Sequence, residues 1–213
     1  MSERHTIDVS LSEIAQRSGL NSALVKYYFG NKEGLMLALV QREASRALAE
    51  LELLLGLDLS PSEKLQRHIA GIINNFFRTP YLNRLLHSLL DERNARSRSA
   101  REVTRFFVKP LLALQRRLLR QGVAAGEFRS IDPVLFYVSV LGACDHLFNA
   151  RYVLRPTVSS APVTEALRER YIGHVTDIFM QGISPRPARA RPRRAARAEH
   201  ALMGSVRTAE VAQ

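Results

Sequence analysis

Apolar residues recur every three or four positions along most of the chain, which is the spacing of an amphipathic helix. The repeat is clear over residues 65–76, 82–90 and 103–118. No stretch alternates apolar and polar residues for long enough to predict a strand. We therefore predict an all-α fold.

Start and stop signals divide this pattern into separate helices. Ser60 and Glu63 form a potential capping box, and Pro61 suits the first helical position. Charged, aperiodic residues from Asp91 to Arg101 predict a loop, and Pro110 should kink the helix that follows. Two of the helices expected after residue 60 start at residues 61 and 80, and three more span residues 101–124, 133–152 and 162–180.

The stretch from Ser10 to Gly34 predicts two short helices joined by a tight turn. Ser10 and Glu13 can form a capping box, Gly19 can take positive φ where the first helix ends, and Asn21 or Ser22 can cap the second. The turn is then about three to four residues long, as in a DNA-binding helix-turn-helix. A third, long helix should follow from Asn31 to about Leu55.

The second of these helices carries small, basic and hydroxylated side chains. Small side chains let a backbone approach base edges in the major groove, as a recognition helix requires. Lys26 and the hydroxyls of Tyr27 and Tyr28 are candidate donors to DNA phosphates. Lys32, beside the amide groups that begin the third helix, is a further candidate. The stretch thus predicts a partner of double-stranded DNA.

The run IAQRSGLNSALVKYYFGNKEGL resembles the DNA-binding region of TetR-type transcriptional regulators. The family carries Ile-Ala, a following Gly, a Tyr-x-Phe or Tyr-Tyr-x-Phe, and a Lys-Glu or Lys-Asp before Leu. The resemblance implies a DNA-binding regulator, a ligand-responsive repressor. It implies base-edge or groove-facing roles for Asn21, Ser22 and Ala23, and phosphate contacts for Lys26, Tyr27 and Lys32.

TetR-type proteins have a full helix before the helix-turn-helix, whereas only nine residues precede Ser10 here. Without that helix, we expect Ile14, Val25 and Phe29 to expose apolar faces. Two explanations remain open: the true start lies upstream of Met1, or the DNA-binding head is damaged.

The resemblance also implies an effector site and a homodimer. The effector cavity should lie between residues 65 and 119, and its candidate lining residues are His68, Asn75, Phe76, Leu86, His87 and Phe107. For the polar ones, an ordinary hydrogen-bonded or solvent-facing role is the alternative. The last two helices have apolar faces wide enough to pair with a second copy, which would place two recognition helices about 34 Å apart on a palindromic operator.

The charge of the chain supports a polyanionic partner, although much of it lies far from the predicted head. The 213 residues carry a net charge of +11, and seven Arg against two Glu fall within residues 184–213. We predict a DNA-binding region over residues 1–34, a ligand-binding and dimerisation domain over 35–182, and a basic, disordered tail over 183–213. A general nucleic-acid binder driven by this tail is one alternative function.

No catalytic, metal or cofactor site is predicted, and we expect a regulator and not an enzyme. Cys144 is the only cysteine, and the histidines are scattered without metal-ligand spacing. Cys144, Asp145 and His146 are adjacent, so on a helix they point in different directions and cannot form a triad. The absence of a membrane-length apolar run or a signal peptide predicts a cytoplasmic protein. A dimeric ligand-binding protein that has lost specific DNA recognition is a second alternative.

Overall fold

The computed structural model describes residues 9–79, 81–90, 96–149 and 163–185, and within these ranges it contains helices and no strand. The predicted all-α fold is therefore confirmed. None of the described helices is long and apolar enough to cross a membrane. The elements in chain order are α1 (Leu11–Ser18), α2 (Ser22–Phe29), α3 (Lys32–Gly56), α4 (Pro61–Arg78), α5 (Leu82–Leu90), α6 (Arg98–Val103), the π-helical turn η2 (Thr104–Val108), α7 (Lys109–Ala124), α8 (Pro133–Asn149) and α10 (Glu165–Ile183).

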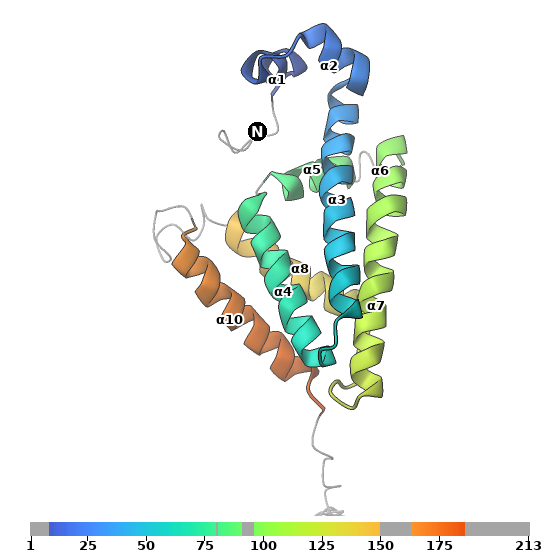
Figure 1. Ribbon diagram of the computed structural model, residues 1–213, viewed down its shortest axis with the longest axis vertical. Helices are drawn as coiled ribbons and strands as arrows, with labels where there is room; N and C mark the ends of the chain where they lie inside the picture. Colours follow the sequence, from blue (N-terminus) through green and yellow to red (C-terminus); the bar gives the residue numbers. More distant parts are fainter. Residues whose placement is uncertain (1–8, 80, 91–95, 150–162, 186–213) are drawn as a thin grey trace, which may run out of the picture.

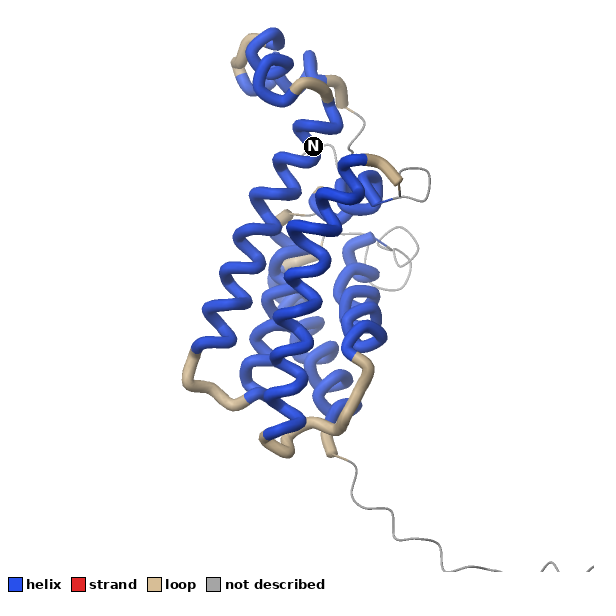
Figure 2. The backbone as a smooth tube through the Cα atoms, turned by 90° about the vertical axis from the view of Figure 1, so that its right-hand side faces the viewer, coloured by secondary structure: helices blue, strands red, loops and turns tan. Residues whose placement is uncertain are grey.

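The two short N-terminal helices lie at one end of the molecule, beyond the body formed by the other helices (Figures 1 and 2). The long helix α3 joins them to this body and runs beside α6 and α7 (Figure 1). On the other side, α4 packs against α8 and α10. Any movement of the head relative to the body therefore passes through α3.

Two apolar clusters hold the body together. The larger one surrounds α4, where Leu65, Ile69 and Ile73 lie on one buried face, as their spacing predicts. The smaller one lies nearer the head and joins α3, α5 and α6; its buried members are Met36, Val40, Leu85, Leu89 and Val103. Because α3 contributes to both clusters, it is fixed to the body along most of its length.

The cap residues place most helix starts where the sequence predicts them. The backbone N–H of Glu63 donates to Ser60 Oγ at 3.2 Å, and the Glu63 carboxylate accepts the Ser60 N–H at 2.9 Å, which confirms the capping box. The hydrogen bond from the Ser60 backbone N–H, with a smaller effect of the Ser60 side chain, lowers the pKa of the Glu63 carboxyl group below its usual value.

Several predicted helix boundaries were wrong. Helix α6 begins at Arg98, inside the predicted loop, because Ser97 Oγ accepts the N–H of Ala100 and caps a new helix there. Helix α10 extends three residues beyond its predicted end, to Ile183, and is capped by Thr164. The start of this helix also differs from the prediction: residues 163 and 164 are not helical, and α10 begins at Glu165 and not at 162. The described ranges do not include residues 91–95, 150–152 and most of the predicted basic tail.

The sequence predicts a kink at Pro110, and the structure has a π-helical turn directly before this residue. Proline has no N–H to donate and its ring crowds the preceding turn, so a regular helix cannot continue through it. Here the backbone N–H of Lys109 donates to Thr104, five residues earlier. The wider turn accommodates Pro110 at the start of α7.

Candidate functional site

The turn between α1 and α2 has the geometry expected of a helix-turn-helix. Ser10 and Glu13 form the predicted capping box at the start of α1, with the N–H of Glu13 3.1 Å from Ser10 Oγ. Gly19 ends the helix with φ 68° and ψ 15°, and Leu20 N–H donates back to Ala15 at 3.0 Å. Asn21 then caps α2 by accepting the Ala23 N–H at 2.8 Å. Three residues therefore separate the two helices.

Helix α2 is exposed along nearly its whole length, since Val25 is its only buried residue. Asn21, Ser22, Ala23 and Lys26 are all exposed. Tyr27 and Tyr28 are 82% and 71% exposed, and their rings meet edge to face with centroids 5.4 Å apart. A helix that presents so much of its surface at the end of a molecule is available to enter a groove of DNA.

The start of α3 lies against the end of α2. Gly30 has φ 71°, and Asn31 Oδ1 accepts the Gly34 N–H at 2.8 Å. Lys32 is half-buried at this junction. Gly34 packs so closely on the preceding helix that an added Cβ would lie 2.1 Å from the carbonyl oxygen of Phe29. The angle between α2 and α3 thus depends on the absence of a side chain at position 34.

The expected exposure of the head's apolar faces is wrong for Val25, which is 5% exposed because it is enclosed between α1 and α3. Ile14 is half-buried and Phe29 is 37% exposed. Ile14 also lines a groove of about 440 Å³, together with Val9, Leu35 and Leu39. Part of the apolar surface left in the head therefore lies along this groove between α1 and α3.

A cavity of about 310 Å³ lies inside the body, between α3, α4, α5, η2, α7 and α8. Leucine, isoleucine and phenylalanine make up half of its lining residues. Five of the six predicted residues line it: His68, Asn75, Phe76, Leu86 and Phe107. His87 does not, because α5 turns Leu85 and Leu89 inward and leaves His87 exposed. Polar lining residues that the sequence did not indicate are Glu50, Arg67, Asn83, Gln115 and Tyr137.

His68 and Gln115 form a hydrogen-bonded pair in the wall of the cavity. His68 Nε2 lies 2.9 Å from Gln115 Nε2, and Gln115 is buried. Part of the His68 surface faces the cavity, but the ring is withdrawn from bulk water. Burial lowers the pKa of His68 to about 4 and raises the pKa of Tyr137, also in the wall, to about 12. Both side chains are therefore uncharged at neutral pH.

The neutral state of His68 makes the stability of the protein depend on pH. Unfolding restores the ordinary pKa of 6.5, so the unfolded chain binds more protons between pH 6.5 and pH 4. Above pH 6.5, His68 does not reduce the free energy of unfolding. As the pH is lowered towards 4, its titration reduces this free energy, by roughly 2 kcal/mol at pH 5. His68→Phe should remove this part of the pH dependence in urea unfolding.

Ile72→Val is the matched control, because it also changes the cavity wall but adds no titrating group. It should lower the free energy of unfolding by about 1 kcal/mol equally at pH 7 and pH 5. A His68→Phe protein that loses as much stability as the wild type between these pH values would contradict the assignment.

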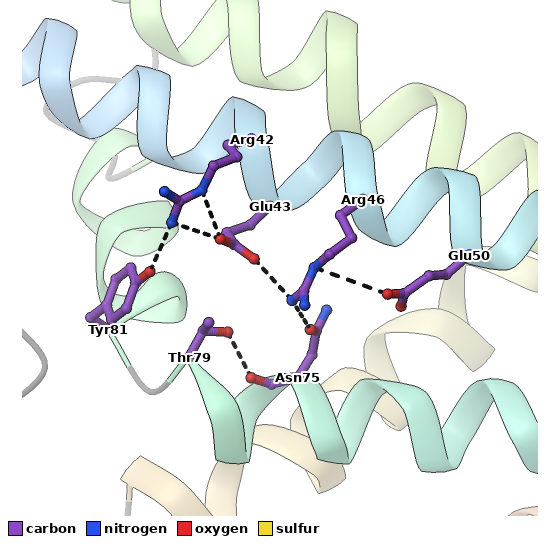
Figure 3. A network of polar contacts seen from close by, with 7 residues as sticks. All are labelled: Arg42, Glu43, Arg46, Glu50, Asn75, Thr79 and Tyr81. Carbon is purple, nitrogen blue, oxygen red and sulfur yellow. Dashed lines mark hydrogen bonds and ion pairs between the residues drawn. The ribbon is translucent and has the colours of Figure 1, made fainter.

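A network of polar side chains links the cavity wall to α3 (Figure 3). The buried Glu43 carboxylate binds Arg42 at 2.8 Å and Arg46 at 2.9 Å. Arg46 also donates to Asn75 Oδ1 at 2.8 Å, and Asn75 lines the cavity. Arg42 reaches Tyr81, beside α5. The helix that carries the head is thus hydrogen-bonded to a residue of the cavity wall.

The adjacent residues Cys144, Asp145 and His146 lie in different surroundings. Cys144 is buried, and burial raises the pKa of its thiol to about 12, so it stays protonated at neutral pH. The Asp145 carboxylate accepts a hydrogen bond from Asn83, and His146 is exposed. Across the described ranges, no three His, Cys, Asp or Glu side chains gather as a metal site would require.

Sequence comparisons agree with this arrangement of an exposed helix-turn-helix above a helical body. Residues 2–39 match the family described as bacterial regulatory proteins, tetR family, and residues 58–187 match the tetracyclin repressor-like C-terminal domain. The chain belongs to the TetR family of transcriptional regulators. The resemblance seen in the helix-turn-helix residues is thereby confirmed. No curated protein matches the chain.

Solved structures of transcriptional regulators share the fold at low sequence identity. A TetR/AcrR regulator from Thermobifida fusca is 22% identical, with a TM-score of 0.62 over 82% of this chain and 86% of that one. The ketosteroid transcriptional regulator KstR2 of Mycobacterium tuberculosis is 18% identical, with a TM-score of 0.61 over 84% and 86%. FadR from Bacillus subtilis, solved with stearoyl-CoA, is 18% identical, with a TM-score of 0.56 over 82% and 89%.

Proposed function

We propose that this TetR-family protein is a ligand-responsive repressor that binds a palindromic operator as a homodimer. The observation that carries the proposal is the exposure of α2, which projects from the end of the molecule with only Val25 buried. Asn21, Ser22 and Ala23, at its N-terminal end, would face base edges, and Lys26, Tyr27 and Lys32 would contact phosphates. Such a repressor works on DNA in the cytoplasm.

Homodimerisation is supported by the outer faces of α8 and α10. Leu135 is 66% exposed and Val138 60%, and Ile178 of α10 is 54% exposed. Gly142 and Gly173, also exposed, have no atom within 4 Å of an added Cβ, so a partner helix could approach closely there. An apolar, small-residue surface of this kind suits a two-fold interface in which each helix pair meets its own copy.

Ligand response is supported by the hydrogen bond between Arg46 and Asn75. A ligand that displaces the Asn75 side chain from the cavity wall would break a contact to α3. Since α3 carries the head, its position would change with it. In a dimer, moving two heads apart or together alters their fit to successive major grooves, and so the affinity for the operator.

The proposal predicts specific DNA binding. In fluorescence anisotropy on the DNA upstream of its own gene, we expect a preference of about a thousandfold over a random duplex. Ser22→Ala should change which sequence is preferred, whereas Lys26→Ala should weaken binding to all sequences and reduce the salt dependence by about one counterion. Leu135→Asp should give monomers and lower the operator affinity without changing the order of preference.

The two alternative functions give different results in the same titration. A dimeric ligand-binding protein without specific recognition would bind operator and random duplex equally weakly. Binding driven by the arginines of residues 184–213 would be indiscriminate, would weaken steeply with salt and would survive Lys26→Ala. Either result would overturn the repressor proposal.

A further inference from the structure

The cavity in the body has a chemical character that selects among ligands. Among the described residues that line the cavity, the charged ones are Glu50 and Arg67. Both are exposed where the cavity meets solvent. Glu50 lies 4.0 Å from Arg46, and Arg67 lies close enough to Glu63 to stabilise that carboxylate. The opening therefore carries balanced charge, and the interior carries none.

The interior polar groups are neutral and most are already engaged. Asn83 donates to Asp145, and Asn75 accepts from Arg46. His68 and Tyr137 are both held in their uncharged forms by burial. An ionised ligand group placed among them would lose its hydration without gaining a counter-charge, which is costly in a buried site.

The His68–Gln115 pair offers hydrogen bonds that a neutral ligand can use. If the Gln115 amide donates to His68 Nε2, the pair retains the Nδ1–H donor of His68 and the carbonyl acceptor of Gln115. If the amide is turned, His68 donates instead, and the pair retains an imidazole acceptor and an amide donor. In either arrangement at least one donor and one acceptor remain, which suits a hydroxyl, carbonyl or amine group.

We propose that the cavity binds a compact, uncharged and largely apolar molecule that carries one hydrogen-bonding group, which pairs with His68 and Gln115. The volume of about 310 Å³ lies at the lower end of the roughly 300–1,000 Å³ typical of small-molecule sites, which favours compact ligands over bulky ones. The proposal deepens the ligand response inferred above and rests on it. A regulator that binds an anionic ligand would differ from this chain in the charge of the ligand that its cavity accepts.

Two fluorophores with the same skeleton test the charge requirement. N-phenyl-naphthylamine is uncharged, apolar and carries one N–H, and anilinonaphthalene sulfonate adds an anionic sulfonate to it. Both fluoresce when transferred from water to an apolar site. We expect the neutral probe to saturate at one molecule per chain and to bind at least about tenfold more tightly than the sulfonate, a difference of about 1.4 kcal/mol.

Gly71→Phe tests whether the cavity is the binding site. Gly71 lines the cavity on α4, and an added Cβ there would meet no atom within 4 Å, so a side chain can be added without a clash. The variant should fold and bind the neutral probe at least about tenfold more weakly. Gly56→Phe is the control, since position 56 is equally open but lies outside the cavity wall. It should bind the probe as the wild type does.

Gln115→Met tests the polar contact, because it keeps the length of the side chain and removes its amide. The neutral probe should bind about fivefold to tenfold more weakly to this variant. If the two probes bind with equal affinity and Gly71→Phe weakens the binding of both, the proposal of an uncharged ligand is wrong. Neutral-probe binding unaffected by Gly71→Phe, or no binding at all, would overturn the site. DNA anisotropy of the same samples separates these failures from a failure of the repressor proposal.

Discussion

Gly34→Ala is expected to reduce operator affinity by about 10–100-fold, the equivalent of losing one or two good base contacts. The new Cβ would lie 2.1 Å from the Phe29 carbonyl oxygen, and 3.2 Å from the carbonyl carbon. This oxygen belongs to the backbone at the end of α2, so the clash can be relieved only by moving α2 relative to α3. Anisotropy titration with the upstream DNA measures the loss.

The control for this variant is Gly56→Ala, at the other end of the same helix. Position 56 is open, and both changes favour the helix by up to about 1 kcal/mol, so propensity cannot explain a difference between them. Amide hydrogen exchange gives a readout that does not depend on DNA: exchange in α1 and α2 should accelerate in Gly34→Ala only. Unchanged affinity together with unchanged exchange would show that the junction tolerates a side chain.

Gly122→Ala is expected to destabilise the body by about 3 kcal/mol, at the upper end of overpacking effects, and to lower Tm by roughly 6–12 °C. After α7 the chain reverses through Gly126 and places the Phe128 ring directly over Gly122. A Cβ at position 122 would lie 1.9 Å from this ring. Phe128 is 3% exposed within the larger apolar cluster, so the ring has no room to move.

A double-mutant cycle identifies the ring as the cause. Phe128→Ala removes the Cγ, Cδ2 and Cε2 atoms that an alanine at position 122 would meet, so the double variant should be more stable than the sum of the single effects predicts. Gly71→Ala, in open space on α4, should instead raise the free energy of unfolding by up to about 1 kcal/mol. Additive losses in the cycle would contradict the proposed close packing.

The head could be predicted from the sequence because its signals are local. Ser10 and Glu13 lie three residues apart, and the hydrogen bonds that make the capping box connect only these two residues. Gly19 likewise ends α1 through its own backbone conformation. Such signals do not depend on the rest of the fold. The burial of Val25 was missed because it depends on how α1 and α3 meet around it.

The cavity could be predicted only in part, because its wall is assembled from distant segments. Phe76 and Phe107 stand on inward faces that helical spacing reveals. Gln115 and Tyr137 give no such signal, since a glutamine or tyrosine on a helix is ordinary until its neighbours are known. His87 was wrongly included for the same reason: it lies near inward leucines in sequence, but about 100° from Leu86 around the helix.

The π-helical turn before Pro110 determines which side of α7 lines up with the buried side of α6. Val103 and Leu111 are eight residues apart, which in an uninterrupted α-helix would place them about 80° out of alignment. The turn absorbs one residue and brings the two nearly into line, and Leu118 follows seven residues later. Val103 belongs to the cluster near the head and Leu111 to the cluster around the cavity. A single inserted residue thus lets one apolar stripe along α6 and α7 contribute to both clusters.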